Sequence, residues 1–124
     1  MVDKHVRILF GSGALFNLMA GLSILFAGPL FGRLIGMEPL PGQGFFEQAT
    51  GFAIVLFGWM YWLVGQAPVK YRPYIMIGII GKLGTVTLAF FNYWTGMLNL
   101  PLPLLTLVDL IYAALFWRYL SGTR

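Results

Sequence analysis

The chain has 124 residues and a net charge of +4, and 59% of its residues are hydrophobic while only 10% are charged. Ordinary soluble domains contain about 25% charged residues, and a chain of this length needs them to cover the surface that it leaves in water. The composition therefore excludes an ordinary soluble domain, and the lack of cysteine together with a single histidine, His5, excludes disulfides, thiolate metal sites and histidine-based metal clusters.

Four apolar segments are each long enough to cross a bilayer, which requires about 20 residues of helix. In chain order they cover residues 6–27, 44–65, 74–97 and 102–120. All seven prolines fall between these segments or at their ends, as expected because proline disrupts a helix interior. The segments are apolar nearly all round and lack the alternation of membrane β-strands. The sequence therefore predicts an all-α polytopic membrane protein, a four-transmembrane-helix bundle that forms a single domain over residues 1–124.

The first segment follows a basic start and so shares a feature with secretory signal peptides. Its apolar run extends from Val6 to Ala27, longer than the ~7–15 residues of a signal peptide core, and no A-x-A-like cleavage site follows. We expect it to be a retained membrane span.

For the stretch from Pro29 to Met37 two alternatives are open, a short helix lying on the outer membrane surface or an irregular loop. As a helix it would dip its apolar side chains into lipid, namely Leu30, Phe31, Leu34 and Ile35.

Lysine and arginine residues predict the orientation of the bundle. With four spans, the two termini and the middle loop share one side, and that side carries Lys4, Arg7, Lys70, Arg72, Arg118 and Arg124. The opposite side carries only Arg33. Cytoplasmic loops are enriched in basic residues, so we expect both termini in the cytoplasm (N-in/C-in) and the chain in a bacterial inner membrane.

The basic residues follow this topology and form no stripe, so no nucleic-acid partner is expected. Aromatic residues near span ends, Tyr61 among them, are assigned to the membrane–water interfaces.

A few polar residues lie inside the predicted spans. Asn17 is near the middle of the first, Glu47 in the outer part of the second, Lys82 in the third, and Asp109 and Tyr112 in the fourth. A lone charge at the bilayer centre costs at least ~2.5–3.5 kcal/mol, so such residues usually find partners inside the bundle. We predict a Lys82–Asp109 pair with Asn17 or Tyr112 as hydrogen-bond partner. Glu47 is shallower and either lines an outward-facing mouth or is solvated at the interface.

This polar cluster has two interpretations. It is either a functional pocket, proton path or ligand site, or a structural pair that sets the register of the helices. Gly78, Gly81 and Gly84 recur every three residues and predict a smooth strip for helix packing. The surrounding segment "GIIGKLG" lacks the strand–loop–helix context of a phosphate-binding loop. No catalytic motif is present, so we expect no catalytic residue, metal or cofactor, and an enzyme is the less favoured interpretation.

In layout the whole chain resembles the DoxX-like group of small four-helix bacterial membrane proteins. The matching features are the length, four spans, charged residues within them, and a first helix that reads "LFGSGALFNLMAGLSILFAGPLFGRLIG". The resemblance implies an accessory subunit of a membrane oxidoreductase system and transfers no catalytic residue. A small multidrug transporter is similar in size, but its hallmark is a glutamate in the first helix, where this chain has Asn17.

Three functional hypotheses follow. The favoured one is an accessory or structural subunit of a larger membrane complex, with the bilayer and other membrane subunits, or a second copy of the chain, as partners. The second is a proton-coupled small-molecule transporter that uses Glu47, Lys82 and Asp109. The third is a binder of a lipid-, quinone- or sterol-like ligand in a pocket between the helices. Its proposed aromatic lining consists of Phe46, Phe52, Trp59 and Phe90.

Overall fold

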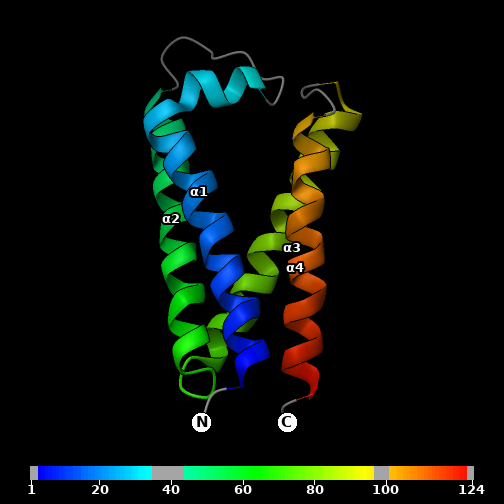
Figure 1. The fold of residues 1–124 in the computed structure, drawn as a ribbon. Helices are drawn as coiled ribbons and strands as arrows, with labels where there is room; N and C mark the ends of the chain where they lie inside the picture. Colours follow the sequence, from blue (N-terminus) through cyan, green and yellow to red (C-terminus); the bar gives the residue numbers. More distant parts are fainter. Residues whose placement is uncertain (1–2, 35–43, 97–100, 123–124) are drawn as a thin grey trace.

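The computed structural model describes residues 3–34, 44–96 and 101–122. Four helices run through this part of the chain and no strand occurs in it (Figure 1): α1 (Lys4–Leu34), α2 (Gly44–Gln66), α3 (Arg72–Trp94) and α4 (Pro101–Gly122). All four are long and apolar enough to cross a membrane, the candidate span of α1 being Lys4–Ala27. The all-α four-helix membrane bundle is thus confirmed, and the chain is a multi-pass membrane protein.

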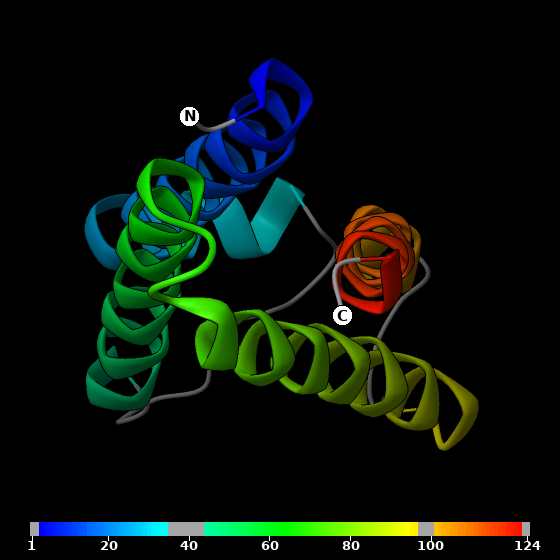
Figure 2. The ribbon, with the colours of Figure 1, turned by 90° about the horizontal axis from the view of Figure 1, so that it is seen from below.

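Both ends of the described chain lie at one end of the bundle, where α1 starts and α4 finishes (Figure 1). We call this the terminal end, and the other the distal end. Helices α1 and α2 run side by side, as do α3 and α4, whereas α3 meets α2 near the terminal end and diverges from it toward the distal end (Figures 1 and 2). The bundle is therefore tighter at its terminal end.

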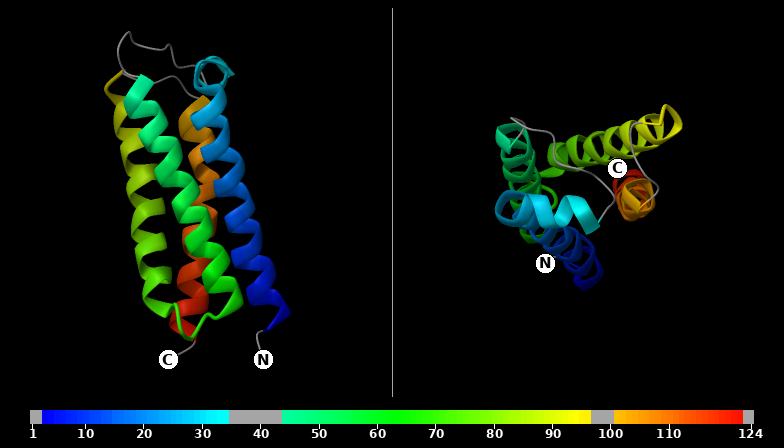
Figure 3. Two further views of the ribbon diagram at one scale, coloured as in Figure 1. Left: turned by 90° about the vertical axis from the view of Figure 1, so that its left-hand side faces the viewer. Right: turned by 90° about the horizontal axis from the view of Figure 1, so that it is seen from above.

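Helix α1 bends at Ala27, whose φ of −133° and ψ of 38° are not helical. Pro29 follows two residues later and has no N–H to donate to the carbonyl of Leu25, and in a regular helix a proline ring crowds that carbonyl, so the helix is interrupted in this turn. Beyond the bend, the helix continues to Leu34 and lies crosswise over the distal end (Figures 1 and 3). Of the two alternatives for the stretch from Pro29 to Met37, the structure thus shows the helix, as far as Leu34. Residues 35–37 of that stretch lie outside the described residues.

Glycines allow α1 and α2 to approach closely. A Cβ built on Gly21 would lie 2.8 Å from the carbonyl oxygen of Gly51, and a Cβ on Gly51 would lie 2.8 Å from the carbonyl oxygen of Gly21. Small residues serve this purpose in membrane bundles because packing, not hydrophobicity, drives helix association there. The crossing of α1 and α2 is thus built around these two glycines.

The half of the bundle nearest the terminal end is filled by a buried apolar cluster, which we call the terminal core: Phe10, Ala14, Tyr61, Val64, Ile75, Ile79, Phe116 and Leu120. It draws residues from all four helices, and the rings of Phe10 and Phe116 stack with centroids 4.6 Å apart. Nearby, the Arg72 guanidinium donates to the carbonyl of Leu120 at 3.0 Å, which ties the start of α3 to the end of α4. This core holds the four helices together below the polar cluster.

Candidate functional site

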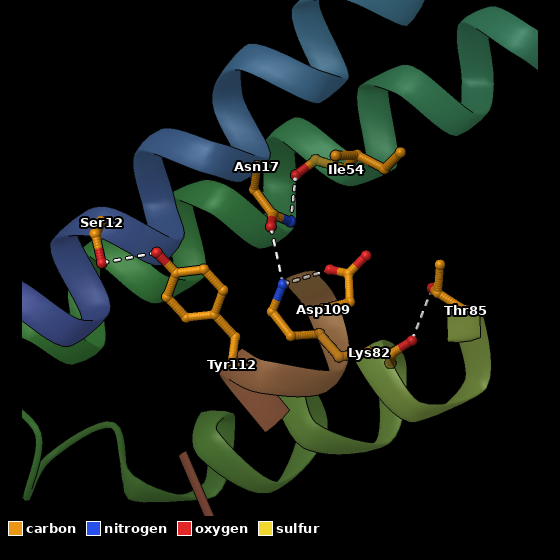
Figure 4. A network of polar contacts seen from close by, with 8 residues as sticks. Ser12, Asn17, Ile54, Lys82, Thr85, Asp109 and Tyr112 are labelled. Atoms are coloured by element: carbon orange, nitrogen blue, oxygen red, sulfur yellow. Dashed lines mark hydrogen bonds and ion pairs between the residues drawn. The ribbon is translucent and has the colours of Figure 1, made fainter. Parts of the chain in front are cut away.

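A charged pair lies near the middle of the bundle. The Lys82 ammonium contacts Oδ1 of Asp109 at 2.7 Å and donates a second hydrogen bond to Oδ1 of Asn17 at 3.2 Å (Figure 4). Nδ2 of Asn17 in turn donates to the carbonyl of Ile54 at 3.2 Å. Lys82 is 3% exposed and Asp109 is 17% exposed. One continuous polar network therefore joins all four helices.

The positions of the two charges along the chain explain why they meet. Lys82 is ten residues beyond the terminal-end start of α3, and Asp109 is eight residues beyond the distal start of α4. At a rise of ~1.5 Å per residue they lie ~15 Å and ~12 Å from opposite ends of the bundle. Each alone would be a costly charge at the bilayer centre, so pairing stabilises both.

Aromatic rings surround the Lys82 ammonium. Its nitrogen lies 5.1 Å from the ring centroid of Tyr61, 5.4 Å from that of Tyr112 and 5.6 Å from that of Phe16. Ring faces attract cations at such distances. Since Asp109 and Asn17 occupy two of the three N–H donors, one donor has no oxygen partner among the described residues.

A cavity of about 360 Å³ extends from this charged pair into the distal half of the bundle. All four helices line it, mostly with apolar side chains, among them Phe16, Ile24, Ile54, Phe57, Leu102 and Leu105. Pockets that bind small molecules range from about 300 to 1,000 Å³ and combine apolar walls with a few placed polar groups. This cavity has the size and lining of a small ligand site.

The deep end of the cavity offers both kinds of hydrogen-bonding group. Lys82 engages one carboxylate oxygen of Asp109; the other points away from the ammonium in Figure 4 and accepts no hydrogen bond from the described residues. The buried ring of Tyr61 also lines the cavity there. A ligand group that both donates and accepts can therefore be held at this end, next to an ion pair whose charges already cancel.

Four of the five predicted cluster residues come together, three of them through hydrogen bonds, and Glu47 lies apart. Lys82 and Asp109 form the predicted pair, and of the two expected partners it is Asn17 that bonds to it. The hydroxyl of Tyr112 instead donates to Oγ of Ser12 at 2.9 Å, although its ring faces the ammonium. Glu47 lies in the first turn of α2 and does not line the cavity. Of the two alternatives for Glu47, a place in the lining of the cavity is therefore not found, and solvation at the interface stays a prediction.

The predicted glycine strip packs over part of its length. A Cβ on Gly78 would lie 2.6 Å from Cε1 of Tyr61, and one on Gly81 would lie 3.3 Å from Cε1 of Phe57. At Gly84 a Cβ would meet no described atom within 4 Å. The strip therefore brings α3 against α2 at the first two positions, and the prediction was wrong for the third.

The aromatic lining differs from the expected one. The four residues proposed from the sequence, namely Phe46, Phe52, Trp59 and Phe90, are all exposed and do not line the cavity. Tyr61, assigned to the membrane–water interface, is 1% exposed. It lines the cavity together with Phe57, which precedes it by one helical turn on the same face of α2. Two aromatic residues four positions apart on α2 therefore face two glycines three positions apart on α3. This match between the two helices was the signal that the sequence analysis missed.

Comparison with family models, curated proteins and solved structures found no match. The resemblance to DoxX-like proteins therefore stays a prediction. In the described residues no group of three or more His, Asp or Glu side chains is placed to hold a metal ion. The geometry of the cavity and its charged pair is thus the basis for a functional proposal.

Proposed function

We propose that this membrane protein binds a small neutral amphiphile, with the apolar body of the ligand in the cavity and its polar head at Lys82 and Asp109. The observation that carries the proposal is that an apolar cavity of about 360 Å³ ends on a buried ion pair with spare hydrogen-bonding capacity. The proposal corresponds to the third hypothesis from the sequence, a binder of a lipid-, quinone- or sterol-like ligand.

The charges of the pair favour a neutral head group. Lys82 and Asp109 compensate each other, so an ionised ligand would bring an unbalanced charge into an apolar site. A hydroxyl suits the site, because it can donate to the free oxygen of Asp109 and accept from the remaining N–H of Lys82. A carbonyl oxygen would use the second of these contacts alone.

Binding accounts for the geometry better than transport. The terminal core fills the bundle between the cavity and the terminal end, so a transport cycle would require a second conformation in which that core separates. The accessory-subunit hypothesis stays a prediction, and it is compatible with ligand binding because a subunit of a larger complex can hold a lipid or a quinone.

We also propose that the terminal end faces the cytoplasm of a bacterial cell. Among the described residues, basic side chains at that end are Lys4, Arg7, Lys70, Arg72 and Arg118, against Arg33 at the distal end. Retention of basic residues on the cytoplasmic side supports this orientation. The cavity then lies in the outer half of the membrane.

Photolabelling tests the proposal. The protein is reconstituted in nanodiscs and exposed to a fatty alcohol that carries a diazirine on its chain, with the corresponding carboxylate and quaternary ammonium compounds in parallel. We expect the alcohol to label cavity-lining peptides and to do so roughly tenfold more efficiently than either charged compound, because neither finds a counter-charge.

A volume-filling variant supplies the specificity control. Ala20→Phe places a ring in the cavity without changing a polar group, whereas Ala49→Phe makes the same substitution at an exposed position that does not line the cavity. Labelling of the cavity peptides should fall in the first variant and persist in the second. Equal labelling by all three compounds, or equal loss in both variants, would contradict the proposal.

A further inference from the structure

The residues that line the cavity differ in exposure from one side of the bundle to the other. Thr50 and Ala53 of α2 and Thr85 of α3 line the cavity and are also exposed. On the opposite side, the lining residues Ile24 of α1 and Leu102 of α4 are half-buried. A side chain that both lines a cavity and is exposed marks the place where the cavity opens, so the opening lies between α2 and α3.

The close contacts that two glycines of α3 make with α2 lie on the terminal-end side of this opening. The two helices are in close contact at Gly78 with Tyr61 and at Gly81 with Phe57. One turn farther along α3, at Gly84, no described atom lies within reach of a Cβ. Figures 1 and 2 show the two helices diverging toward the distal end. The contact of Gly81 with Phe57, both of which line the cavity, therefore lies at the terminal-end edge of the opening.

The depth of the opening places it against acyl chains. Thr50 is six residues from the distal start of α2, and Thr85 is nine residues before the distal end of α3. At ~1.5 Å per residue they lie ~9 Å and ~14 Å inside the helical spans. The hydroxyl of Thr85 donates to the carbonyl of Gly81 at 2.9 Å, so its hydrogen-bonding need is met within its own helix. This edge of the opening thus suits contact with hydrocarbon.

The distal end is partly crossed by the bent portion of α1. Residues beyond Ala27 lie over that end and run from α1 toward α4 (Figure 3), with Leu30 and Leu34 exposed. Exposed leucines on a helix lying crosswise at a membrane surface are typical of an interfacial helix. The bent portion of α1 thus lies over part of the distal end, with a character suited to the membrane surface.

We infer that the ligand enters the cavity sideways from the bilayer, through the opening between the distal halves of α2 and α3. The inference rests on the proposed function and narrows the ligand class to molecules dissolved in the membrane, such as a long-chain alcohol or another neutral lipid. Water-soluble molecules of similar size do not reach the site by this route. The threonine and alanine side chains at the opening leave room for a chain to pass.

Cross-linking the opening tests the inference. The chain has no cysteine, so Thr50→Cys/Thr85→Cys carries only the two introduced thiols. The variant is placed in nanodiscs and bridged with reducible bifunctional methanethiosulfonate reagents of graded length. The rate at which the diazirine fatty alcohol labels cavity peptides is then measured before bridging, after bridging and after reduction. Should this variant fail to fold, Ala53→Cys/Thr85→Cys offers a second bridge across the same opening.

The outcomes separate the access route from the binding proposal. We expect bridging to slow labelling roughly tenfold or more, as closure of a gate does, and reduction to restore the rate. Each single-cysteine variant, treated with a monofunctional reagent, controls for bulk added at the opening. A complete bridge that leaves the rate unchanged would overturn lateral access while ligand binding stands. Absence of cavity labelling in the unbridged protein would overturn both.

Discussion

Tyr61 of α2 packs its ring directly against the backbone of Gly78 on α3, so closely that a Cβ at position 78 would lie 2.6 Å from Cε1 of the ring. The same ring belongs to the terminal core, lines the cavity, and lies 5.1 Å from the Lys82 ammonium. A glycine without a side chain thus allows one tyrosine to join α2 to α3 and to form part of the deep end of the candidate site.

Replacement of this glycine should disturb both packing and site. Gly78→Ala forces the ring of Tyr61 to move, and because the ring is buried we expect a loss of about 1–3 kcal/mol in the free energy of unfolding, as for other overpacked positions. Unfolding in bicelles by added denaturing detergent measures the change.

Gly84→Ala is the matched control, on the same helix and with no described atom within 4 Å of the added methyl. Alanine is also the better helix former, by up to about 1 kcal/mol, so this variant should be neutral or slightly more stable. Equal destabilisation by both substitutions would show that the helix itself, and not contact with Tyr61, is sensitive.

The crossing of α1 and α2 should tolerate substitution even less. Gly21→Ala and Gly51→Ala each bring a methyl to 2.8 Å from backbone atoms of the neighbouring helix. A side chain can change its rotamer to avoid such a clash, whereas the backbone of a helix cannot. We expect losses at or above the upper end of the ~1–3 kcal/mol range in the same unfolding assay. Gly11→Ala, which meets no described atom within 4 Å, should leave stability nearly unchanged. A well-folded Gly21→Ala protein of normal stability would contradict the close approach of the two helices.

Much of the fold could be predicted from the sequence because the membrane limits the alternatives. Spans of about 20 apolar residues must be helices, and prolines lie near their limits, so the predicted segments agree within three residues with the candidate membrane spans, although α1 itself continues to Leu34. The Lys82–Asp109 pair was predictable for a related reason, since two opposite charges at similar depth in lipid are expected to meet.

The side that each helix turns inward could not be predicted in the same way. The helices are apolar nearly all round, so the pattern did not distinguish the buried Tyr61 from the exposed Trp59 two residues before it. The cavity depends on the divergence of α2 and α3. That divergence depends on specific contacts between the helices, at Gly78 and Gly81, and no single residue type in the sequence indicates it. The tilt between two helices depends on the contacts between them, so the sequence of one helix alone does not determine it.

The contribution of the ion pair can be measured by a double-mutant cycle. Lys82→Met and Asp109→Asn each leave one partner of a 2.7 Å pair without its counter-charge, and breaking buried pairs in this way costs about 3–5 kcal/mol in soluble proteins. We expect large losses of unfolding free energy in both single variants and a loss in the double variant that is well below their sum.

Glu47→Gln makes a comparable carboxylate-to-amide change at a position outside the cavity, and we expect it to change stability by no more than about 0.5 kcal/mol. If the losses of the two single variants simply add in the double variant, the pair contributes no coupling energy. Lys82 and Asp109 would then act independently, which the contact between them argues against.

Asn17 gives the last prediction because it connects the pair to α1 and α2. Asn17→Leu keeps a similar side-chain volume but removes the acceptor for Lys82 at 3.2 Å and the donor to the carbonyl of Ile54. Interhelical hydrogen bonds in membranes contribute about 0.6 kcal/mol on average, and bonds to charged groups about 1.5–3 kcal/mol, so a loss of about 1–2 kcal/mol is expected. Ser12→Ala removes the acceptor of a more exposed hydrogen bond from Tyr112 and should cost less. A larger loss at Ser12 than at Asn17 in the unfolding assay would place the main polar link of the bundle between α1 and α4 near Tyr112, and not at Lys82.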